Sequence, residues 1–108
     1  MDIQAYMFEL GRNARRAARA LAAAGTGAKN LALLRTADAL LAQAEALREA
    51  NQRDLAEGRA RGLDDAFLDR LALTEPRIQA MAQGLREVAA QPDPVGEVVR
   101  MWKRPNAL

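Results

Sequence analysis

Residues 63–88, LDDAFLDRLALTEPRIQAMAQGLREV, contain two helix starts in succession and decide the fold. Asp64 precedes a short apolar run, and Thr74 precedes Glu75 and Pro76. Asp and Thr side chains accept hydrogen bonds from the free amides of a helix N-terminus, where Pro is also tolerated. We therefore predict a short helix capped by Asp64 and a longer one capped by Thr74. Their expected core residues are Phe67, Leu68 and Leu71 in the first helix, and Ile78, Met81, Leu85 and Val88 in the second.

The residues before this pair predict further helices. A helix that starts at Ile3, capped by Asp2, would carry one apolar stripe with steps of four and three, and its basic residues would lie nearly opposite. The stripe is Ile3, Met7, Leu10, Ala14, Ala17 and Leu21, and the basic residues are Arg12, Arg15, Arg16 and Arg19. We expect Gly25-Thr26-Gly27 to end this helix through a left-handed glycine.

A second helix is predicted from about Ala28, and Asn51 is expected to cap a continuation that ends at Gly62. The expected buried residues of this part are Leu31, Leu34, Leu41, Ala44 and Leu47. Pro92-Asp93-Pro94 should end the helical region, because Pro cannot continue a helix. The chain is thus predicted to be mainly α-helical, with four to five helices.

Residues 95–108 differ in composition from the helices. Val95, Val98, Val99, Met101 and Trp102 are β-branched or bulky residues in a run of about nine, which favours a strand followed by a turn. A lone strand leaves its own backbone groups unpaired, so it needs a partner strand. We therefore divide the chain into a helical segment, 1–94, and an incomplete strand and turn, 95–108.

Composition bounds the function. The 108 residues suit one domain with a net charge of +2, and they include no Cys and no His. This excludes Cys and His nucleophiles, thiolate metal sites and imidazole bases within this sequence. No apolar run reaches the roughly 20 residues that span a bilayer. Gly11–Gly25 is rich in Arg, as a mitochondrial transit peptide is, but transit peptides have few acidic residues and this N-terminus contains Asp2 and Glu9. We therefore expect a cytoplasmic protein.

Three groups of side chains could bear chemistry, and each has a structural alternative that we favour. The carboxylates of Asp64, Asp65 and Asp69 could form an acid–base pair or bind a metal, but their positions suit helix caps and surface charges. The four Arg residues of the first helix could bind nucleic acid or a membrane, but the charge excess is small and aromatic residues are 4% of the chain. Lys103–Leu108 with Trp102 could dock on a partner, but they also suit a strand and turn. We predict no catalytic, cofactor-binding or metal-binding residue, no nucleic-acid partner and no membrane partner.

Several short motifs in fixed order give the sequence a specific resemblance. They are Ala50-Asn51, Asp54, Arg61-Gly62-Leu63, Leu68–Thr74 (LDRLALT), Arg77-Ile78, Asp93–Gly96 (DPVG) and Trp102–Leu108 (WKRPNAL). The chain resembles the N-terminal region of the glutamate-5-semialdehyde dehydrogenase (gamma-glutamyl phosphate reductase) family, within the aldehyde dehydrogenase superfamily. Ala107 departs from the glycine that is usual at that position.

The resemblance implies an N-terminal fragment of an α/β enzyme. Intact members reduce L-glutamyl 5-phosphate with NADPH to glutamate 5-semialdehyde and phosphate, in proline biosynthesis from glutamate, and they use a Cys nucleophile. None of that machinery matches a position here, so this chain alone is expected to be inactive. The implied partner is the remainder of the same polypeptide or a further copy in a homo-oligomer. The alternative is a free-standing helical interaction module without enzymatic activity.

Overall fold

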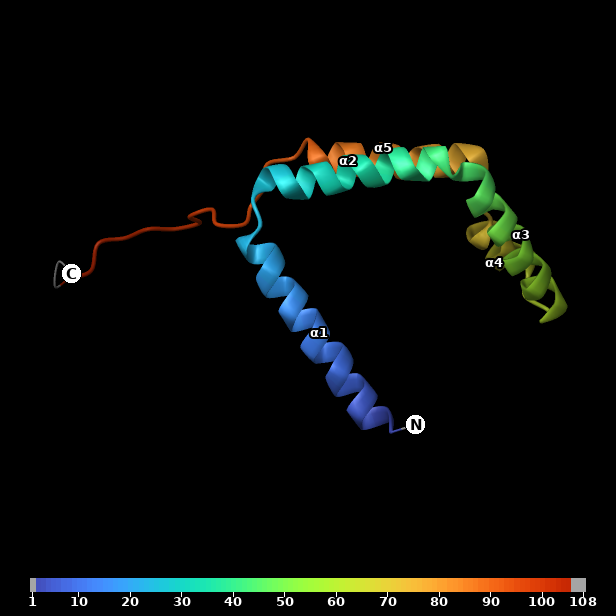
Figure 1. The fold of residues 1–108 in the computed structure, drawn as a ribbon, viewed down its shortest axis with the longest axis horizontal. Helices are drawn as coiled ribbons and strands as arrows, with labels where there is room; N and C mark the ends of the chain where they lie inside the picture. The colour runs from blue at the N-terminus through green and yellow to red at the C-terminus, as the bar shows by residue number, and fades with distance from the viewer. Residues whose placement is uncertain (1, 106–108) are drawn as a thin grey trace. The chain divides into compact units, whose positions relative to one another are not determined.

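The computed structural model describes residues 2–105, which contain five α-helices and no strand (Figure 1). The helices are α1 Ile3–Ala23, α2 Thr26–Ala42, α3 Ala44–Ala60, α4 Asp65–Leu71 and α5 Glu75–Ala89. They fall into two compact units. One unit is Lys29–Gln91, and the other joins the described residues up to Ala28 with those from Pro92 onward. The mainly helical fold with up to five helices is therefore confirmed.

Three of the four predicted polar caps, Asp2, Asp64 and Thr74, are confirmed. Asp2 Oδ1 accepts a hydrogen bond from the Ala5 amide at 3.2 Å, and Asp64 Oδ1 accepts one from the Phe67 amide at 2.7 Å. Thr74 Oγ1 accepts from the Arg77 amide at 3.3 Å. Each cap supplies an acceptor to an amide that has no partner inside its helix.

The first helix does not end through the left-handed glycine that was predicted. α1 ends at Ala23, and Ala24 continues in an extended conformation with its amide bonded to the Leu21 carbonyl. The glycines with a positive φ are Gly62 and Gly96, so Gly25 does not supply a left-handed end. α2 also starts at Thr26, two residues earlier than expected. A poor helix former is enough to interrupt the helices here without a left-handed turn.

Asn51 lies inside a helix instead of capping one. α3 already begins at Ala44, following a bend at Gln43, and the helical hydrogen bonds continue across it: the Gln43 amide bonds to Ala39 O and the Leu47 amide to Gln43 O, both at 3.0 Å. The predicted stop near Gly62 is confirmed, because α3 ends at Ala60 and Gly62 adopts a φ of 79°.

The buried core lies within the unit Lys29–Gln91. It consists of Ala37, Leu55, Leu68, Ile78 and Ala82. α3 packs against both α4 and α5, and an ion pair between Arg86 and Asp38 joins α5 to α2, which runs beside it in Figure 1.

Several predicted core residues are instead exposed. They are Leu31, Leu34, Leu41, Phe67, Met81 and Val88, with exposed fractions from 37 to 52%. Each helix meets neighbours on only part of its circumference, so an apolar stripe broader than the contact stays open to solvent.

The strand predicted for residues 95–108 is not present in the part that the structure describes, residues 95–105. Residues 95 and 96 form a turn, in which Gly96 has a φ of 87° and the Glu97 amide bonds to the Pro94 carbonyl at 3.1 Å. Residues 97–104 have no regular structure, and Val98, Val99, Met101 and Trp102 are exposed. A ladder needs a second strand, and the described residues offer none. Positions 106–108 of the predicted segment lie outside the described residues.

Candidate functional site

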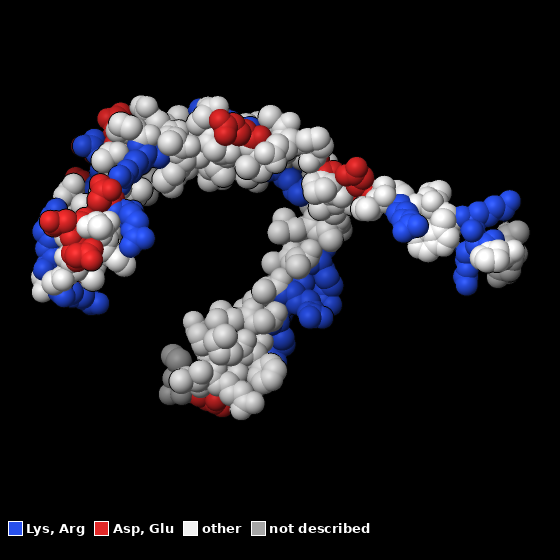
Figure 2. Space-filling view, turned by 180° about the vertical axis from the view of Figure 1, so that it is seen from behind, with Lys and Arg blue, Asp and Glu red and all other residues white. Residues whose placement is uncertain are grey.

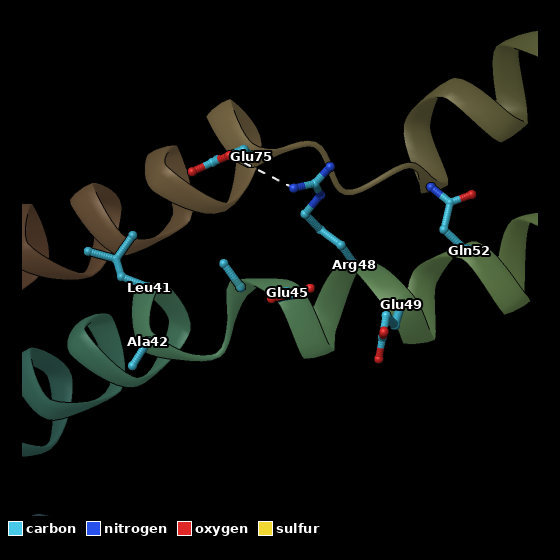
Figure 3. A pocket seen from close by; sticks show the side chains of 8 residues that line it. Leu41, Ala42, Glu45, Arg48, Glu49, Gln52 and Glu75 are labelled. Carbon is cyan, nitrogen blue, oxygen red and sulfur yellow. Dashed lines mark ion pairs between the residues drawn. The ribbon is translucent and has the colours of Figure 1, made fainter.

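A surface hollow of about 540 Å³ lies where α2, α3 and the start of α5 meet (Figure 3). Its lining is Leu41, Ala42, Ala44, Glu45, Arg48, Glu49, Gln52 and Glu75. In Figure 3 the Arg48 side chain extends from α3 toward Glu75 of α5, whereas Glu49 points away from it. Arg48 Nη1 and the Glu75 carboxylate are 3.8 Å apart, and both side chains are more than half exposed.

This hollow has the chemistry of a polar surface. An exposed ion pair at that separation contributes little to stability and does not desolvate either group. The lining has neither a nucleophilic thiol nor an imidazole base, and no group of three or more possible metal ligands occurs within residues 2–105. The sequence did not indicate this hollow, because its residues come together only through the bend between α2 and α3.

The three carboxylates considered in the sequence analysis, Asp64, Asp65 and Asp69, do not form one site; each has a separate structural role. Asp64 caps α4, and Asp65 lies in the first turn of the same helix. Asp69 is paired with Arg77, whose Nη2 lies 3.2 Å from the carboxylate. The Arg77 guanidinium also donates to the carbonyl oxygens of Asp69 and Ala72. Arg77 thus joins the end of α4 to the beginning of α5.

The basic residues of α1 gather along one flank of the helix (Figure 2). Arg12 is paired with Glu9 at 2.7 Å, and Arg16 donates to Asn13 at 3.4 Å. Arg15 and Arg19 line a shallow hollow with small residues of the same helix. No helix in residues 2–105 combines the length and apolarity needed to cross a membrane.

Contacts of Asn51 and Thr26 with residues far along the sequence were not predicted from the sequence. Asn51 is 5% exposed; its Nδ2 donates to the Leu71 carbonyl at 3.0 Å, and its Oδ1 accepts from the Leu73 amide at 2.8 Å. Thr26 Oγ1 donates to Asp93 at 2.7 Å, which joins the start of α2 to the segment after α5. The one available signal was a polar Asn in the middle of a helical pattern, from which the sequence predicts a helix cap.

Comparison with known proteins relates the chain to larger enzymes. No family model matches it. Over 99% of its length it is 54% identical to gamma-glutamyl phosphate reductase from Rhodospirillum rubrum, and likewise 56% identical to that from Syntrophomonas wolfei. The crystal structure of gamma-glutamyl phosphate reductase (TM0293) from Thermotoga maritima matches 93% of the chain with a TM-score of 0.82 and 35% identity.

These matches define the class of the protein first: the chain is similar to one helical part of reductases that are much longer. It spans about a quarter of the curated relatives, 25% of the first and 26% of the second, and 24% of the solved chain. The chain is related to the gamma-glutamyl phosphate reductases, as its motifs predicted, and a match to a quarter of each relative fits their N-terminal portion.

Proposed function

We propose that the chain is the N-terminal part of a gamma-glutamyl phosphate reductase. The intact enzyme would reduce L-glutamyl 5-phosphate to L-glutamate 5-semialdehyde and phosphate in the cytoplasm, as a step of proline biosynthesis. The observation that supports this best is the identity above 50% across nearly all of the chain to two relatives with that name.

The residues present do not fit the chemistry of the reaction itself. The nicotinamide cofactor NADPH would supply the hydride in the intact enzyme, but this sequence has no glycine-rich phosphate loop and no Cys nucleophile to hold or attack a substrate. The chain's contribution is therefore structural: it provides a helical layer and the segment 95–105. That segment exposes Val98, Val99 and Met101, side chains suited to a strand once a neighbouring strand supplies its hydrogen bonds.

The chain by itself is expected to be inactive. Purified protein should not oxidise NADPH when glutamyl phosphate is supplied. NADPH oxidation by the 108-residue chain that depends on glutamyl phosphate would overturn this part of the proposal.

A chimera tests the family assignment directly. The matched quarter of the Rhodospirillum rubrum relative is replaced by this chain, and the relative without that quarter serves as the control. We expect the chimera to reduce glutamyl phosphate and the control to fail. A chimera that is soluble and folded but inactive would contradict the proposal.

A further inference from the structure

We draw no further inference here: the strongest candidate, the exposed apolar face of α1 that carries Ile3, Met7, Leu10 and Leu21, has no partner in its own unit, and nothing in the structure shows what covers it.

Discussion

Replacing Asn51 with leucine should destabilise the unit Lys29–Gln91 strongly. The side chain satisfies two main-chain groups of the connection between α4 and α5, and it is almost fully buried. Leucine has a similar size but no polar atom, so the Leu71 carbonyl and the Leu73 amide would each lose a partner. A buried polar group without a partner costs about 1–3 kcal/mol, and the added apolar burial offsets only part of this. We expect a loss of about 3 kcal/mol.

Urea denaturation followed by circular dichroism measures this loss. With a slope of about 1–2 kcal/mol per molar urea, the midpoint should fall by roughly 2 M while the slope stays constant. Gln52→Leu is the matched control, because Gln52 is the neighbouring residue of α3 but is exposed, and its effect should stay within about 0.5 kcal/mol. Equal midpoints for Asn51→Leu and the natural protein would refute the bridging role.

The substitution Asn51→Asp tests the two hydrogen bonds of this side chain individually, because it keeps the acceptor for the Leu73 amide and removes the donor to the Leu71 carbonyl. The ionised carboxylate can still accept from the Leu73 amide, but it repels the Leu71 carbonyl oxygen. Burial should raise the pKa of the introduced carboxyl, so the folded state binds the proton more tightly than the unfolded state. Its stability should therefore increase as the pH falls from 7 to 4, relative to that of Asn51→Leu. A stability difference between the two variants that does not change with pH would contradict this account.

Three further substitutions have defined outcomes in the same assay. Arg77→Ala should lower the unfolding free energy by about 1–2 kcal/mol, because the carbonyl of Ala72 and the end of α4 lose a charged donor. Gly58→Val should cost about 2 kcal/mol, since even a Cβ at this position would lie 3.0 Å from Leu68 Cδ2; a midpoint shift below 0.3 M would show that the neighbours yield. Asp64→Ala removes the cap of α4 and should cost about 1 kcal/mol, with Asp64→Asn retaining most of the stability.

The sequence predicted well what depends on neighbouring residues. The caps Asp2, Asp64 and Thr74 each bond to an amide three residues ahead, so a short window contains the whole interaction. The roles of Asn51 and Arg77 depend on carbonyl and amide groups that become available only when helices pack. No local pattern could show that Asn51 would meet residues 20 and 22 positions away.

The strand and the apolar faces illustrate a second limit. Valine-rich sequence indicates a preference for extended backbone, but a strand forms only when a partner backbone is present, and residues 2–105 contain none. Likewise, the periodicity of α1 predicts an apolar face but could not say whether that face would be covered, and α1 buries no residue. For the candidate site, the acidic set and the Arg flank were placed on the correct elements, whereas the hollow around Arg48 arises from the bend at Gln43.

The unit Lys29–Gln91 is formed by one uninterrupted stretch of sequence, so it can fold while the chain is still being synthesised. All of its core residues, from Ala37 to Ala82, and the Asn51 bridge lie within this one uninterrupted stretch. Contacts between residues close in sequence form quickly, on timescales of microseconds to milliseconds, whereas translation adds only about 5–20 residues per second. The helical unit can therefore complete its packing soon after residue 91 leaves the ribosome. In a longer polypeptide it would then be a finished surface on which later segments assemble.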